Sequence, residues 1–354
     1  MSDKITPRTN TKLFGHEETE SMLLRDLESG KLPHGVILSG ARGAGKATLA
    51  YRFARTLLSG RTDMELSTED PIFRRIAAGS HTDLLVIELL YDPKKDEYAS
   101  EISIEQSRTI AQNLSLTPAE GQWRVVIIDS ANALNTKSAN AILKILEEPP
   151  PQTILMLIAH NVGGLLPTIR SRCRVIPLKP LSQKNFAKCL HHIAPEISGE
   201  EITALGIISD YSPGIALELK EQGAIELYYE ILDLLCSASE LDNQRIYRFC
   251  EQIGSGKKAH GNWQLFSHIV LCIMERVAKK SAGAEITKIS AGEEGALSKL
   301  STMYSSATWA TKWQEVLSQF LLAERSHLDY KQVALAFFHS LASEEEFILG
   351  NNAA

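Results

Sequence analysis

The sequence predicts an α/β domain with a five-stranded parallel sheet, followed by two helical regions. Five short apolar runs occur in the first half, helical patterns separate them, and the strand signal stops after Pro180. A chain of 354 residues is long enough for two or three domains. We therefore place the α/β domain at residues 1–180, a small helical domain at 181–224 and an all-helical domain at 225–354.

The predicted strands are continuous apolar runs, as expected for strands that are buried on both faces of a sheet. They are residues 34–40, 83–89, 123–129, 153–159 and 173–179. Because a helical stretch separates consecutive runs, the pattern is β-α-β, and neighbouring strands should be parallel.

One helix of the first half has a clear start and end in NTKSANAILKILEEPPP. Four apolar residues follow the helical period: Ala139, Ile142, Leu143 and Leu146. Asn135 or Thr136 can cap the start, and the prolines at 149–151 end the helix.

The second half has helical periodicity throughout, with a helix start predicted at SPG, residues 212–214. Two wide aromatic stripes follow: Trp263, Phe266, Val270, Ile273 and Val277, then Trp313, Val316, Leu317, Phe320 and Leu321. Each stripe can be the core of its own domain or can face another subunit. The segment GSGKKAHG (254–261) resembles a nucleotide loop, but Glu251 stands where the first glycine belongs, so we interpret it as a loop between helices.

Composition excludes several classes of protein. The chain is 44% hydrophobic and carries a net charge of −6, so any DNA contact would need a local basic patch. The N-terminus has no apolar leader segment, and the apolar runs are too short to span a bilayer, which predicts a cytoplasmic protein. The five cysteines show no C-x-x-C spacing, so we expect free thiols and no metal site.

A phosphate-binding loop is predicted at GARGAGKAT, where Gly40 to Lys46 match G-x-x-x-x-G-K between a strand and a helix. The glycines let backbone N–H groups surround a phosphate, Lys46 can reach its oxygens, and the helix N-terminus adds positive potential. The alternative is a glycine-rich turn that binds no ligand.

Two positions of this site lack the residues that ATP hydrolysis requires. The motif continues with Ser or Thr, whose hydroxyl holds Mg²⁺, but here Ala47 follows the lysine, and Thr48 lies about 100° further around the helix. Asp129 ends the strand RVVIID as a Mg²⁺-binding aspartate should, but Ser130 stands where ATPases carry a catalytic Glu. Both losses argue against hydrolysis.

These residues lie in longer runs that resemble the clamp-loader branch of the AAA+ proteins, in its bacterial DNA polymerase III members. The runs are GHEETESMLLRDLESGKLPHGVILSGARGAGKATLA, HTDLLVIE and WRVVIIDSANALNTKSANAILKILEEPPPQTILMLIAHNVGGLLPTIRSRC. NAILKILEEPP followed by TIRSRC is the most specific part. The resemblance covers residues 15 to about 220 and implies an AAA+ domain, a helical lid and a C-terminal collar domain that joins a hetero-pentamer.

The resemblance also implies roles for individual residues. The S-R-C motif supplies an arginine finger to a neighbouring subunit's ATP, which maps onto Arg172; the alternative is a solvated basic edge. Arg170, Arg172 and Arg174 alternate, so an extended segment would project all three to one face. The degenerate ATP site would comprise Gly40, Gly43, Gly45, Lys46, Thr48 and Asp129.

The chain departs from the family pattern at several points. The family's four-cysteine zinc module is absent from RTDMELSTEDPIFRRIAAGS, which predicts no metal, and SPGIALELK lacks the lid arginine that senses ATP. The residue that senses the γ-phosphate from the sheet would be His160 or Asn161, although His160 can equally be a structural histidine.

The resemblance thus implies a non-hydrolysing subunit that presents Arg172 to a motor subunit during loading of the sliding clamp onto primed DNA. Its partners would be tau/gamma motor subunits and a delta subunit, with the clamp and DNA contacted through the assembly and no membrane involved. No cofactor is required, and whether ATP is bound stays open. One rival is an ATP-hydrolysing tau/gamma-type motor, and another is a chain that binds DNA by itself.

Overall fold

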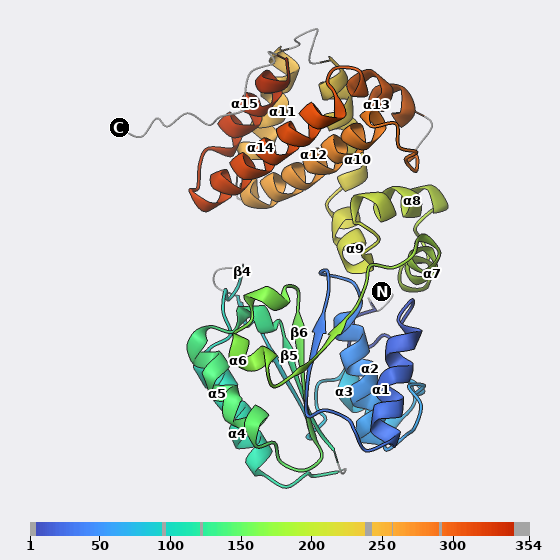
Figure 1. Ribbon diagram of the computed structural model, residues 1–354, viewed down its shortest axis with the longest axis vertical. Helices are drawn as coiled ribbons and strands as arrows, with labels where there is room; N and C mark the ends of the chain where they lie inside the picture. Colours follow the sequence, from blue (N-terminus) through green and yellow to red (C-terminus); the bar gives the residue numbers. More distant parts are fainter. Residues whose placement is uncertain are drawn as a thin grey trace. The chain divides into compact units, whose positions relative to one another are not determined.

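The computed structural model describes residues 5–93, 97–120, 123–237, 243–256, 258–289 and 292–342. The chain divides into two compact units (Figure 1). The first comprises the described residues within Met1–Glu196 together with Tyr211–Gly214, and the second those within Ile197–Asp210 and Ile215–Ala354. The expected lid segment, 181–224, contributes to both units, and the three domain boundaries stay a prediction.

The first unit is built on a five-stranded parallel sheet in the order β2-β5-β6-β1-β7. Its strands are β1 (Gly35–Ser39), β2 (Leu84–Glu88), β5 (Arg124–Asp129), β6 (Thr153–Ala159) and β7 (Arg174–Pro177). The predicted strands are confirmed. A short antiparallel hairpin, β3 (Tyr91–Asp92) and β4 (Glu97–Tyr98), follows β2 and was not expected from the sequence.

Helices cover both faces of this sheet (Figure 1). The helices of one face are α1 (Glu17–Glu28), α2 (Lys46–Ser59) and α3 (Pro71–Ala77). Those of the other face are α4 (Ile104–Ser115), α5 (Thr136–Glu147) and α6 (Pro167–Arg170), and α7 (Gln183–Ile193) follows the sheet. Each face has its own apolar core, because strands buried on both sides present side chains alternately to the two layers.

Helix α5 follows the expected pattern. The side chain of Asn135 accepts a hydrogen bond of 3.0 Å from the backbone N–H of Ser138, which caps the helix, and the helix ends at Glu147, before the prolines. Its apolar stripe, with Ile142 and Leu146 fully buried, packs under the sheet. The prediction for this helix is confirmed.

The described residues of the second unit form helices and no strand. They are α8 (Gly199–Ile208), α9 (Pro213–Glu221), α10 (Ala224–Ser237), α11 (Asn243–Gly254), α12 (Ala259–Ser281), α13 (Glu293–Ser301), α14 (Ser306–Arg325) and α15 (Tyr330–Ala342), of which α9 begins in the first unit. The fold class, an α/β domain followed by helices, is confirmed. None of the helices described is long and apolar enough to cross a membrane.

The two aromatic stripes of this unit differ. Every member of the first stripe, on α12, is buried, so that stripe is core of the unit. On α14, Val316 and Phe320 are buried but Leu321 is 42% exposed. Within the segment 254–261, Gly254 ends α11 and residues 259–261 begin α12, so the described connection between the two helices is shorter than the expected loop.

A buried charge pair joins three helices of the second unit. The guanidinium of Arg276 on α12 donates to a carboxylate oxygen of Glu293 on α13 at 2.8 Å, and Tyr228 on α10 donates to the same oxygen. The backbone N–H of Ile289 donates to the other oxygen at 2.8 Å. Because the side chains of Arg276 and Glu293 are only 8% and 1% exposed, each charge depends on the other.

We expect Glu293→Ala to lower the free energy of unfolding of the helical unit by about 3–5 kcal/mol, because it leaves the Arg276 charge buried without its partner. Urea denaturation followed by circular dichroism measures this. The control is Glu294→Ala, which removes a half-exposed carboxylate paired with Lys288 and should change the unfolding free energy far less, because solvent screens an exposed ion pair. Equal losses in the two variants would contradict the assignment.

Candidate phosphate-binding site

The loop between β1 and α2 has the backbone that the motif requires. The φ angles of Gly40, Gly43 and Gly45 are 143°, 74° and 96°, a region that side chains disfavour. A Cβ at Gly40 would lie 2.3 Å from the carbonyl oxygen of Leu178, which follows β7. The glycines therefore serve both the turn and the close approach of the neighbouring chain.

The carbonyl oxygens of the loop are bonded on its outer side by segments far away in the sequence. The donors are the hydroxyl of Ser212 to Arg42 (2.6 Å), the backbone N–H of Gly214 to Gly43 (3.2 Å) and Nε2 of His16 to Ala44 (2.9 Å). These bonds occupy carbonyl oxygens of the loop. The N–H groups at the start of α2 have no partner within the helix, so they can bind an anion. This arrangement suits a phosphate.

Lys46 bonds to the remaining carbonyls of the loop. Its ammonium donates to Gly40 at 2.8 Å and to Ala41 at 2.6 Å, and the residue is only 3% exposed. Burial lowers the pKa of Lys46 to about 8, although the negative charge of Asp129 opposes that shift. Below that pH the loop holds a positive charge beside its N–H groups.

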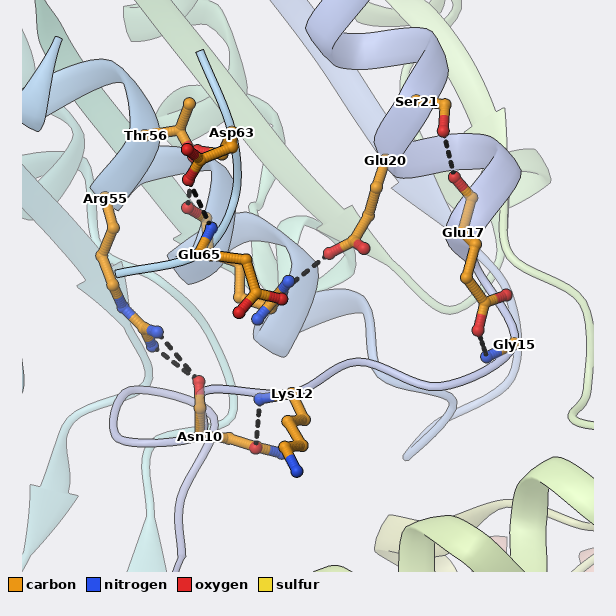
Figure 2. A network of polar contacts seen from close by, with 11 residues as sticks. Asn10, Lys12, Gly15, Glu17, Glu20, Ser21, Arg55, Thr56, Asp63 and Glu65 are labelled. Atoms are coloured by element: carbon orange, nitrogen blue, oxygen red, sulfur yellow. Dashed lines mark hydrogen bonds and ion pairs between the residues drawn. The ribbon is translucent and has the colours of Figure 1, made fainter. Parts of the chain in front are cut away.

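The segment that carries His16 is tied to α2 (Figure 2). The buried guanidinium of Arg55 donates two hydrogen bonds of 2.9 Å to the carbonyl of Asn10, and the side chain of Asn10 accepts from the N–H of Lys12 at 2.9 Å. Arg52 pairs with Glu20 at 2.7 Å. Burial lowers the pKa of Arg55 to about 10. These contacts hold the N-terminal segment against the helix that follows the loop.

Asp129 ends β5 at the same edge of the sheet as the loop. Burial raises the pKa of its carboxyl, the Lys46 charge opposes this, and Glu88, its register partner on β2, adds to the rise. The neighbouring hydroxyl of Ser130 accepts a 3.3 Å hydrogen bond from the N–H of Asn132 and so caps a local turn. At position 47 only a methyl group is present, and it packs against the core.

The two candidates for the phosphate-sensing residue differ in their surroundings. The side chain of Asn161 accepts from the N–H of Gly163 at 2.8 Å, so it caps the turn that follows β6. The pKa of His160 is lowered by burial and then by the charges of Lys46 and Arg42, so His160 lies within range of the loop's cations.

Arg172 lies at the opposite end of the sheet. Its carbonyl oxygen is 3.3 Å from the position of a Cβ on Gly35, the first residue of β1, whereas the loop follows Ser39. At about 3.3 Å per residue, the length of β1 separates the two by roughly 15 Å. The structure therefore brings together the glycines, Lys46 and Asp129 and leaves Arg172 apart from them. Thr48 is buried in the first turn of α2.

The guanidinium of Arg172 has three partners. It donates to the carbonyl of Thr168 at 3.0 Å and to the hydroxyl of Ser171 at 3.3 Å, and it pairs with Glu147 at the end of α5 at 2.7 Å. The side chain is 35% exposed, so it is held and also accessible from solvent.

The expectation that the three arginines project to one face is wrong. Arg170 is the last residue of α6, a turn follows, and only Arg174 begins β7. Arg172 pairs with Glu147 on one face of the sheet, whereas Arg174 pairs with Asp26 of α1 on the other, at 2.5 Å. The segment is not extended before Arg174, so the alternation in sequence has no counterpart in space.

No group of three metal-binding side chains occurs within the described residues, and the cysteines there are free. Burial raises the pKa of the Cys173 thiol to about 12. A thiol that stays protonated at neutral pH is unreactive, so Cys173 serves packing.

Comparison with known proteins finds similarity to subunits of DNA polymerase III. Residues 15–182 match the family described as DNA polymerase III, delta subunit. The delta' subunit of Pseudomonas aeruginosa is 33% identical over 203 residues, which are 56% of this chain and 60% of that protein. The gamma subunit of a Buchnera aphidicola strain is 32% identical over 217 residues, 60% of this chain and 57% of the relative.

The tau subunit of Escherichia coli is 32% identical over 198 residues, 55% of this chain and 29% of tau. The chain thus spans less than two thirds of the length of each of these relatives. A solved Thermotoga maritima protein related to the gamma subunit covers 93% of this chain and 94% of its own at 21% identity, with a TM-score of 0.37.

We expect Lys46 to titrate near pH 8, and Asp129→Asn to lower that midpoint by up to about one unit, because it removes the charge that opposes the effect of burial. NMR titration of the lysine side-chain signals measures this, with Lys46→Arg identifying the signal. The folded state binds fewer protons than the unfolded chain between pH 8 and 10.5, so Lys46 makes the unfolding free energy rise with pH across that window. A Lys46 midpoint near 10.5 would contradict the burial of its charge.

We expect Gly214→Ala to destabilise the first unit by about 1–3 kcal/mol, because the new Cβ would lie 2.7 Å from the Cα of Gly43. The matched control is Gly199→Ala, where no atom lies within 4 Å of the added Cβ. Thermal unfolding of both variants is compared with the parent chain. If the two variants are equally stable, the contact between 211–214 and the loop is too loose to brace it.

Proposed function

We propose that this chain, whose residues 15–182 match a family of DNA polymerase III subunits, is a clamp-loader subunit and acts as a delta-prime-like subunit. It stands beside a motor subunit and presents Arg172 to the ATP of that neighbour. Hydrolysis by the neighbour drives loading of the sliding clamp onto primed DNA. The chain itself does not hydrolyse ATP.

The position of Arg172 supports this proposal. The guanidinium lies at the end of the sheet opposite the phosphate-binding loop, so it cannot serve the chain's own nucleotide. A guanidinium keeps its charge at all physiological pH values, and its planar donors match the oxygens of a phosphate as charge develops there. Partial exposure leaves it accessible to a neighbour.

The phosphate-binding loop supports the second half of the proposal. The glycine backbone, the N–H groups of α2 and Lys46 would hold a phosphate, but Ala47 offers Mg²⁺ no hydroxyl and Ser130 no general base. Nucleotide bound here would stay intact, and function would require no cofactor in this chain.

The rival is a tau/gamma-type motor that hydrolyses ATP. Sequence identity does not decide between the two, because the chain is about equally similar to delta', gamma and tau relatives. Ala47 and Ser130 favour the non-hydrolysing role. Detectable ATP turnover by the purified chain alone would support the motor instead.

The partners proposed are two kinds of clamp-loader subunit, tau/gamma motors and a delta subunit, with the sliding clamp and primed DNA reached through the assembly. The helical region at residues 225–354 is proposed as the collar domain and residues 181–224 as the lid. The exposed Leu321 on α14 is compatible with such a contact. We propose that the assembly works in the cytoplasm.

The test is ATP turnover by the reconstituted clamp loader, with clamp and primed DNA present, for the parent chain and Arg172→Ala. We expect a drop of about 10³-fold or more at the one motor site that Arg172 serves, diluted in the total rate by the other motor sites. Arg170→Ala, which removes an exposed arginine two residues away, is the control. Size-exclusion chromatography confirms assembly. Unchanged turnover in an intact Arg172→Ala complex would refute the arginine-finger role.

A further inference from the structure

Glu147 is the acidic partner of the proposed arginine finger. Its carboxylate meets the Arg172 guanidinium at 2.7 Å, although the two residues lie on different elements and are far apart in the sequence. The other two partners of the guanidinium, the Thr168 carbonyl and the Ser171 hydroxyl, are uncharged. Among the partners of the guanidinium within the described residues, Glu147 is thus the only one that fixes it by charge.

The placement of Glu147 is unfavourable for its own helix. It is the last residue of α5, where the helix dipole presents its negative end and a carboxylate is repelled. A half-exposed ion pair also adds little to the stability of a fold. Local helix stability therefore does not account for a carboxylate at this position, whereas the nearby guanidinium does.

The three contacts leave Arg172 little rotational freedom before a partner arrives. A free arginine side chain has many rotamers, and ordering it on binding is costly. One terminal nitrogen donates to Thr168 and Ser171, and the other pairs with Glu147. The side chain is still 35% exposed, and an arginine that is already ordered aligns more readily with a transferring phosphoryl group.

We propose that Glu147 is a positioning residue for Arg172, which it orients towards the phosphates of the neighbouring subunit's ATP. This inference rests on the proposed function. Glu147 acts through Arg172 and touches no reacting atom, so its removal should lower kcat at the affected motor site and leave KM unchanged.

The experiment uses the reconstituted clamp loader with clamp and primed DNA and measures kcat and KM for ATP. The variants are Glu147→Ala, Arg172→Ala and the double variant. Glu148→Ala is the matched control, because Glu148 is the next residue, equally exposed and of the same charge. We expect Glu147→Ala to lower kcat at the affected site about tenfold, Glu148→Ala to leave kcat unchanged, and the double variant to have the same kcat as Arg172→Ala.

Glu147→Gln keeps an acceptor oxygen, so it should retain more activity than Glu147→Ala. It replaces Glu147→Ala in the test if the alanine variant does not assemble.

Other outcomes separate the inference from the proposed function. If Arg172→Ala lowers kcat but both Glu147 variants match the parent, the positioning role fails and the finger stands. Faster turnover by Glu147→Ala would mean that the carboxylate restrains the finger, which also overturns the inference. A further loss in the double variant would show that Glu147 acts independently of Arg172. If Arg172→Ala has no effect, the proposed function itself fails.

Discussion

The first unit depends on the hydrogen bonds that the backbone carbonyl groups of the loop between β1 and α2 accept. A phosphate-binding loop turns its N–H groups towards one point, so its carbonyl oxygens must find donors on the other side, and a polar group left buried without one is costly. Here those donors come from Lys46, His16, Ser212 and Gly214. The site is therefore assembled by three separate segments of the chain.

This requirement explains features that are distant from the loop in the sequence. The buried Arg55 holds the N-terminal segment that delivers His16, as Figure 2 shows. The SPG turn both begins α9 and closes on the loop, since Gly214 has no side chain to prevent the approach. Packing thus maintains the geometry of the loop, although Ala47 and Ser130 stand where the sequence pattern of an ATPase has other residues.

The two ends of the sheet carry different chemistry. At the carboxyl ends of the strands, the charge of Lys46 acts on both Asp129 and His160, and burial shifts the pKa of each of the three groups. At the other end, Arg172 is held by α5 and α6 and remains partly exposed. Because a parallel sheet separates its two ends by the length of the strands, the phosphate-binding loop and Arg172 belong to different surfaces of the first unit.

The sequence by itself determined the strands, α5 and the glycine loop, because apolar runs, helical period and φ > 0 positions are local signals. It also identified Ala47 and Ser130 as departures from the pattern of an ATPase, and Arg172 as part of the S-R-C motif, because each stands at a fixed position in its motif. It did not reveal His16, Ser212 or Glu147, and it misplaced Arg174, whose partner is on α1. Only the tertiary structure decided these contacts, because they join residues far apart in the chain whose distance and orientation depend on strand order and on where each turn ends.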